Sequence, residues 1–150
     1  MAIIDIRSSP RFKPTVLLVD DQPTVLSIHA AILNTLDLDL TVAVQTDPLE
    51  ALAYLAKRQV DLLITDFKMP GIDGIWFIKQ AKSLSRHQHL QIIVITALKT
   101  RLAHERILAA GAAHCFTKPA QCDELAKISY ELLHPCNRSY IDNAPGKVNA

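Results

Sequence analysis

The chain has 150 residues, 49% of them hydrophobic, and a formal net charge of +1 from 16 basic and 15 acidic side chains. This length fits one domain with a well-buried core, and the balanced charge gives no electrostatic reason to expect direct binding to nucleic acid or an anionic membrane. No apolar run could span a bilayer or serve as a signal peptide, so we expect a cytoplasmic protein.

The first apolar run, TVLLV, predicts a strand inside a parallel sheet and ends at the acidic pair Asp20 and Asp21. Pro23 suits the first turn of a helix, and the apolar spacing predicts that this helix extends to about Leu36. Four residues carry that spacing: Val25, Ile28, Ile32 and Leu36. A short run at residues 41–44 predicts the second strand.

The next helix has a strong start signal. Asp47, Pro48 and Glu50 have the pattern of an N-cap, a first-turn proline and a capping-box acid. We expect this helix to extend to about Lys57. The run DLLIT then predicts the third strand at residues 62–65.

The segment after Asp66, FKMPGIDG, is predicted to be a loop because it contains two glycines and a proline. A helix is expected from residue 74 or 75 to about 84. The run QIIVI predicts the fourth strand, which ends at Thr96. Residues 100–110 favour a further helix that Gly111 can terminate.

The last run, HCFT, predicts the fifth strand and ends at Lys118, and a final helix is expected at about residues 123–133. Strands alternating with helices predict an α/β doubly wound parallel sheet, for which the strand order 2-1-3-4-5 is one common solution. The domain is expected at residues 14–134, after an N-terminal extension at 1–13 and before a polar tail or linker at 135–150.

The polar residues at the strand ends predict one reaction centre, because the carboxyl ends of parallel strands converge on one crevice. Two bare carboxylates about 4 Å apart repel by on the order of 4 kcal/mol at an effective dielectric near 20, so Asp20, Asp21 and Asp66 need a cation between them. Oxygen ligands of this kind suit Mg2+. Each residue alone has an ordinary role at a turn, cap or surface, and only the combination indicates a site.

With the acidic pair, DLLITDFKMPGIDG, VITA and GAAHCFTKP in this order, the chain resembles the receiver (REC) domain of bacterial two-component response regulators. The resemblance implies a flavodoxin-like receiver fold and a phosphoprotein of a phosphorelay. Asp66 would take a phosphoryl group from the phosphohistidine of a sensor histidine kinase or histidine phosphotransfer protein. The domain would assist only its own phosphorylation and dephosphorylation, and would not be an enzyme acting on another substrate.

The resemblance also implies the roles of the other site residues. Asp21 and Asp66 would bind Mg2+ directly, Asp20 would act mainly through water, and the backbone carbonyl of Lys68 would complete the protein ligands. Lys118 would hold one phosphoryl oxygen, and Thr96 would donate its hydroxyl to another. The small Ala97 would leave room beside Thr96.

One position departs from the family. An aromatic residue usually stands three positions before the strand-five lysine and turns inward with the threonine, but here that position is Cys115. Phe116 is a poor substitute because strand periodicity points it to the opposite face. The departure puts the aromatic half of the switch in doubt. It also weakens the expectation of a homodimer through the face of helix four, strand five and helix five. Equal sedimentation with and without phosphorylation would contradict a dimer that forms on activation.

Two other functions compete with a phosphoacceptor. A phosphatase of the haloacid dehalogenase type needs a second Asp two positions after the nucleophile, where this chain has Lys68. A receiver-like interaction module that works without phosphorylation is the serious alternative, which Cys115 favours and the complete set of reactive residues opposes. The chain is either a stand-alone receiver or the receiver part of a longer regulator. The six histidines share no ligand spacing and are predicted to be scattered surface or core residues.

Overall fold

The structure is a computed structural model that describes residues 13–84 and 89–134. Apart from Lys13, the predicted N-terminal extension lies outside the described residues, as does the predicted tail. Strands and helices alternate along the chain as β1 (Thr15–Val19), α1 (Pro23–Leu33), β2 (Thr41–Gln45), α2 (Pro48–Lys57), β3 (Leu62–Asp66), α3 (Gly74–Ser83), β4 (Gln91–Thr96), α4 (Arg101–Ala110), β5 (His114–Thr117) and α5 (Cys122–Leu133).

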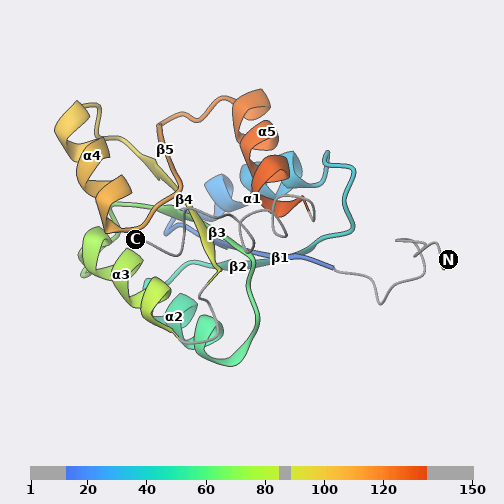
Figure 1. The fold of residues 1–150 in the computed structure, drawn as a ribbon, viewed down its shortest axis with the longest axis horizontal. Coiled ribbons are helices and arrows are strands. Elements are labelled where there is room, and N and C mark those ends of the chain that lie inside the picture. The colour runs from blue at the N-terminus through green and yellow to red at the C-terminus, as the bar shows by residue number, and fades with distance from the viewer. Residues whose placement is uncertain (1–12, 85–88, 135–150) are drawn as a thin grey trace, which may run out of the picture.

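The five strands form one parallel sheet in the order β2-β1-β3-β4-β5 (Figure 1). This order confirms the predicted doubly wound, flavodoxin-like fold. A crossover helix connects each of the first four strands to the next strand, which is the arrangement that parallel pairing requires.

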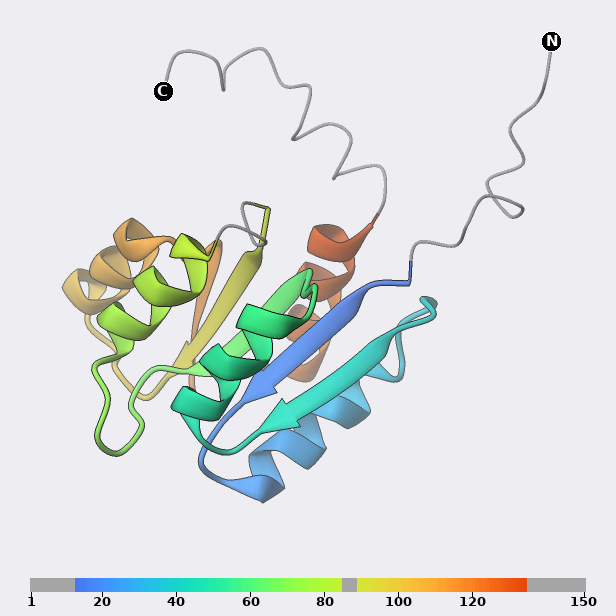
Figure 2. The ribbon, with the colours of Figure 1, turned by 90° about the horizontal axis from the view of Figure 1, so that it is seen from below.

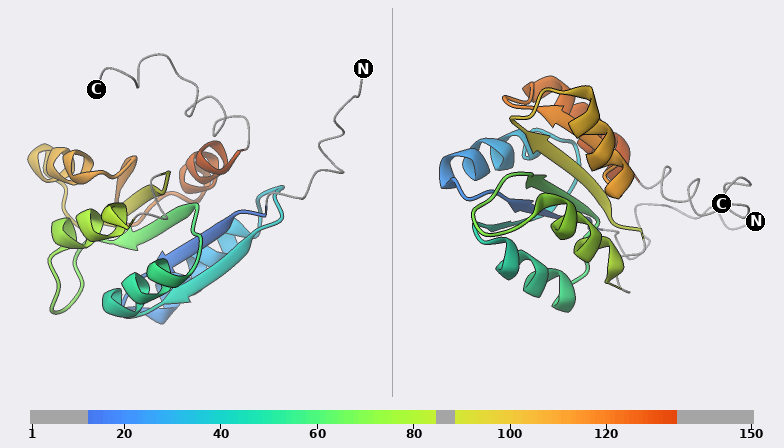
Figure 3. Two further views of the ribbon diagram at one scale, coloured as in Figure 1. Left: turned by 60° about the horizontal axis from the view of Figure 1, so that its bottom comes forward. Right: turned by 90° about the vertical axis from the view of Figure 1, so that its left-hand side faces the viewer.

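Helices cover both faces of the sheet. In Figure 2 the helices α1 and α5 lie on one side, and α2, α3 and α4 lie on the other. Figure 3 shows α3 and α4 side by side at one end of the second layer. Because both faces are covered, every residue of β3 is buried, and this explains why the central strands are continuously apolar.

The predicted end of the first helix, at about Leu36, was wrong. Helix α1 ends at Leu33, and its last carbonyls accept tight-turn hydrogen bonds from Thr35 and Leu36. Leu36 still packs against the core, but from the loop. The helix turns Leu26, Ile32 and Leu33 inward, whereas the side chain of Ile28 is 52% exposed.

The other boundaries agree with the predictions to within about two residues. Asp47 caps α2 through the backbone N–H of Leu49, and Thr100 caps α4 through that of Ala103. Asp66 and Thr96 belong to the last positions of their strands rather than to the loops. Within the described part of the chain, none of the helices has the length and apolar character needed to cross a bilayer.

Candidate functional site

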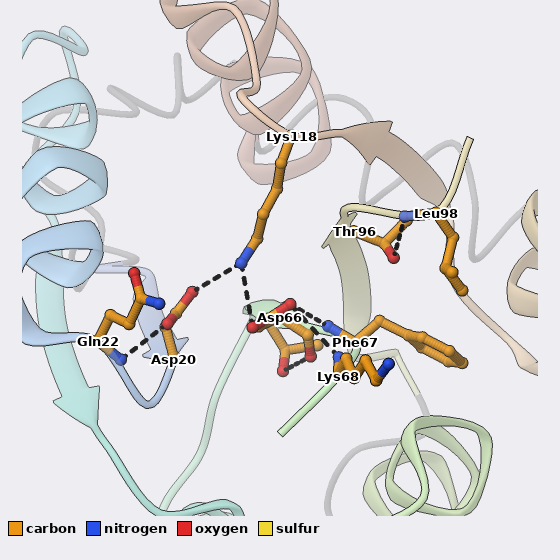
Figure 4. A network of polar contacts seen from close by, with 9 residues as sticks. Asp20, Gln22, Asp66, Phe67, Lys68, Thr96, Leu98 and Lys118 are labelled. Atoms are coloured by element: carbon orange, nitrogen blue, oxygen red, sulfur yellow. Dashed lines mark hydrogen bonds and ion pairs between the residues drawn. The ribbon is translucent and has the colours of Figure 1, made fainter. Parts of the chain in front are cut away.

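Strand register brings the predicted site residues together. Val19 pairs with Thr65, so that the next residues, Asp20 and Asp66, follow side by side. Asp66 pairs in turn with Ile95, directly before Thr96. Thr96 pairs with Thr117, directly before Lys118. The carboxyl edge of the sheet therefore places these four polar side chains around one point (Figure 4).

Asp66 is buried, and both of its carboxylate oxygens have polar partners. Its Oδ1 accepts hydrogen bonds from the backbone N–H groups of Phe67, at 2.7 Å, and Lys68, at 3.4 Å. Its Oδ2 lies 3.1 Å from Nζ of Lys118. Oδ1 is thus occupied by the loop, and Oδ2 faces the open side of the site, where the partly exposed Lys118 lies (Figure 4).

Lys118 also bridges to Asp20, whose Oδ2 lies 3.6 Å from the ammonium nitrogen. The Oδ1 of Asp20 accepts the backbone N–H of Gln22 at 2.9 Å. Burial nevertheless raises the pKa of Asp20 above its ordinary value, although Gln22 and Lys118 favour the charged form. The neighbouring carboxylates of Asp66 and Asp21 add to the rise in this pKa.

The three aspartates form a candidate metal site. One carboxylate oxygen from each of Asp20, Asp21 and Asp66 lies within 4.8 Å of the other two. Asp20 and Asp66 are buried and Asp21 is exposed, so the cluster opens to solvent on one side. Three carboxylates in such proximity repel one another, and an all-oxygen donor set suits a hard divalent cation with room for water ligands.

The remaining predicted residues surround this centre. The hydroxyl oxygen of Thr96 is fully buried and accepts the backbone N–H of Leu98 at 3.1 Å. Ala97 stands between them and is exposed. Lys68 donates its backbone N–H to Asp66, and the role of its carbonyl as a metal ligand stays a prediction.

The departure at strand five is visible in the packing. Cys115 packs against the core beneath α2, α3 and α4, whereas Phe116 packs against the opposite core. Phe116 also stacks on His114, with ring centroids 5.8 Å apart. The prediction that Phe116 points to the face opposite to Cys115 is confirmed.

Sequence reasoning missed two histidines near the site. His29 on α1 lines a cavity of about 360 Å³ beside Lys118, and burial, with a contribution from Lys118, lowers the pKa of its imidazole. His104 on α4 contacts the carbonyl of Leu98 and the hydroxyl of Thr117. Both were predicted to be scattered residues because they share no ligand spacing, and only their positions on these helices could have linked them to the site.

Comparisons with known proteins agree on one family. The family described as "Response regulator receiver domain" matches residues 16–129. The cyclic di-GMP phosphodiesterase response regulator RpfG of Xanthomonas campestris pv. campestris is 32% identical over 118 residues, which are 79% of this chain and 31% of that protein. The protein-glutamate methylesterase/protein-glutamine glutaminase 1 of Pseudomonas savastanoi pv. phaseolicola is 35% identical over 112 residues, or 73% of this chain and 30% of that protein.

The chain therefore spans about a third of the length of these curated relatives. Among solved structures, the chemotaxis response regulator CheY4 of Vibrio cholerae superposes with a TM-score of 0.73 at 26% identity. That match covers 81% of this chain and 99% of the other chain.

Proposed function

Because this chain belongs to the response regulator receiver domain family, we propose that it is a phosphoacceptor in two-component signal transduction. Asp66 takes a phosphoryl group from the phosphohistidine of a sensor histidine kinase or histidine phosphotransfer protein. The observation that carries this proposal is the placement of Asp66 Oδ2 3.1 Å from Lys118 inside a cluster of three carboxylates.

The contacts of Asp66 suggest how the transfer proceeds. Oδ1 is held by two backbone N–H groups, so Oδ2 is the nucleophile. It forms a bond to phosphorus while the bond from phosphorus to the donor imidazole nitrogen breaks and its electron pair leaves with the donor. Lys118 then holds a phosphoryl oxygen as a point charge, and Thr96 donates its hydroxyl to another after turning away from Leu98.

Asp20, Asp21 and Asp66, with the carbonyl of Lys68, are the residues that would hold Mg2+. The donor set fits this ion, which favours oxygen ligands and keeps several waters. When bound, Mg2+ would offset the charge of the carboxylates and of the incoming phosphoryl oxygens. The domain would assist only its own phosphorylation and dephosphorylation.

The cavity beside Lys118 is the surface that we assign to the phosphodonor. It is mainly apolar and adjoins the reacting carboxylate, so a helix that carries the phosphohistidine could bind there with its reactive ring toward Asp66. Its lining comes from α1, β4 and the segment between β5 and α5: Val25, Ile28, His29, Ile32, Ile95, Lys118, Pro119 and Ala120. The exposure of Ile28, at 52%, is consistent with a contact surface for a partner.

The proposal is tested by intact mass after incubation with Mg2+ and a small phosphodonor such as acetyl phosphate. We expect one added phosphoryl group on the wild-type chain and none on Asp66→Asn or on a metal-free sample. Asp73→Asn is the matched control, because Asp73 caps α3 in the loop that follows Asp66 and asparagine is an equally good cap.

A phosphorylation-independent interaction module is the second candidate, and the specific observation that favours it is Cys115. A folded wild-type chain that gains no mass and binds no Mg2+ would contradict the phosphoacceptor proposal and favour this module.

A further inference from the structure

A chain of polar contacts connects the site threonine to helix α4. The Oγ1 of Thr96 accepts the N–H of Leu98 at 3.1 Å, and Figure 4 shows this oxygen turned toward Leu98 rather than toward Asp66. The carbonyl oxygen of the same Leu98 lies 2.7 Å from Nε2 of His104. A third contact joins that Nε2 to Oγ1 of Thr117 at 3.3 Å. Both polar groups of the Leu98 backbone are therefore engaged.

Helix geometry explains why His104 reaches the loop. It is the fourth residue of α4, and its backbone N–H donates to the carbonyl of Thr100, the N-cap. Long side chains on a helix lean toward its N-terminus, which directs the imidazole back to Leu98, six residues earlier.

The chemistry of the contact assigns the proton. A carbonyl oxygen only accepts hydrogen bonds, so the Nε2 of His104 must carry a hydrogen and donate it to Leu98. The longer Thr117 contact shares the same nitrogen and is the weaker of the two.

We propose that His104 is a positioning residue that holds the β4–α4 loop, residues 97–100, in the arrangement of the unphosphorylated domain. This inference rests on the proposed phosphoacceptor function. Because the Oγ1 of Thr96 is turned away from Asp66, the Thr96 side chain must rotate to reach a phosphoryl oxygen there, and this rotation breaks the contact with the N–H of Leu98 and lets the loop move. The bond from His104 opposes that movement by anchoring the Leu98 carbonyl to α4 and connects the loop to β5 through Thr117. His104 thus couples the β4–α4 loop to α4 and β5. In this chain it takes the place of the inward aromatic residue that Cys115 replaces.

A hydrogen bond that exists only in the unphosphorylated arrangement must break when a phosphoryl group binds. The free energy that this bond contributes is therefore lost from the binding free energy of the phosphoryl group. One net hydrogen bond corresponds to about a two- to tenfold change in affinity. Its removal is therefore expected to strengthen the binding of a phosphoryl mimic rather than to weaken it.

The test is a titration of the full chain with beryllofluoride in the presence of Mg2+, followed through the NMR signal of the Leu98 amide. His104→Phe keeps a ring at this half-buried position but removes the donor, and we expect about two- to tenfold tighter binding. His104→Gln keeps an N–H at a similar reach and should bind within about twofold of the wild type. Thr117→Val, which removes the weaker contact, should also change the affinity by less than about twofold.

Urea unfolding of each variant separates coupling from simple structural support. Unchanged or weaker beryllofluoride binding by His104→Phe, or tighter binding by His104→Gln to the same extent, would overturn the assignment of His104. A lower urea midpoint for His104→Phe without a change in affinity would overturn it as well. Failure of the wild-type chain itself to bind beryllofluoride would instead overturn the phosphoacceptor function, and with it the inference that depends on it.

Discussion

At the scale of single residues, burial disfavours the charged form of the Asp20 carboxyl group. Its pKa lies above the ordinary value chiefly because of desolvation, and the ion pair with Lys118 and the hydrogen bond from Gln22 only partly compensate. Between the unfolded and folded pKa values the native state binds more protons than the unfolded state, so this residue lowers the metal-free stability as pH rises through that interval. A carboxylate with such a cost is typical of a functional site.

Cys115 should be protected from alkylation. Burial raises the pKa of its thiol to about 11, so at neutral pH it lacks the reactive thiolate. Cys122 is exposed at the start of α5 and offers a matched comparison in the same chain. We expect iodoacetamide at pH 8 to modify the peptide containing Cys122 at least about tenfold faster than that containing Cys115, measured by mass spectrometry.

The same thiol makes stability depend on alkaline pH. The unfolded thiol loses its proton near its ordinary value, whereas the native thiol keeps it until about pH 11. The unfolded state therefore binds fewer protons in this interval, and Cys115 lowers the free energy of unfolding as pH rises through it. Equal alkylation rates for the two cysteines in the folded protein would contradict the burial of Cys115.

At the scale of elements, the β3–α3 loop links Asp66 to α3 through a close backbone approach. A Cβ atom on Gly74 would collide with the carbonyl oxygen and the ring of Phe67. Phe67 in turn donates its N–H to Asp66. The absence of a side chain at position 74 therefore lets the start of α3 pack directly on the backbone that orients Asp66.

Gly74→Ala should consequently affect both stability and the site. Relief of the collision needs a backbone shift at Phe67, which we expect to lower the free energy of unfolding by about 2–3 kcal/mol and to weaken Mg2+ binding. Gly71→Ala is the control in the same loop. Its Cβ would meet open space and only the positive φ of 77° would be strained, at a cost of about 1 kcal/mol. Urea unfolding and a Mg2+ titration of both variants distinguish the two effects, and equal losses would contradict the packing argument.

At the scale of the whole molecule, the proposed Mg2+ site would couple metal binding to the stability of the fold. The three carboxylates come from the loop after β1 and from the end of β3, which only the folded sheet brings together, so Mg2+ bound at the proposed site would favour the native state over the unfolded chain. At a Mg2+ concentration about 100 times its Kd, we expect the free energy of unfolding to rise by about 2.7 kcal/mol. Addition of EDTA should reverse this gain.

Asp21→Asn should abolish most of the response to Mg2+ while leaving the metal-free fold intact, because Asp21 is the exposed member of the cluster. Asp47→Asn is the matched control, since Asp47 is an exposed cap of α2 and asparagine can also cap a helix. Chemical unfolding with and without Mg2+ measures the difference. A full Mg2+ response in Asp21→Asn would place the metal elsewhere.

The sequence by itself determined the elements and the residues at the carboxyl edge of the sheet, whereas the strand order 2-1-3-4-5 was one common solution that the structure then established. Continuous apolar runs are what strands covered on both faces require, and the end of each run marks where polar side chains begin at the carboxyl edge of the sheet. Asp20, Asp66, Thr96 and Lys118 could therefore be assigned to one site before any geometry was available, because parallel strands end on the same edge.

Only the tertiary structure decided how helices rotate about their axes and which partners their side chains reach. Helix α1 turns Leu26 inward and leaves Ile28 exposed, and the helical spacing of the apolar residues did not specify this rotation. The bridge of Lys118 to two carboxylates and the contact of His104 with Leu98 join residues from different elements. Local sequence patterns report the period of an element, but the facing of one element against another follows from packing across the whole core.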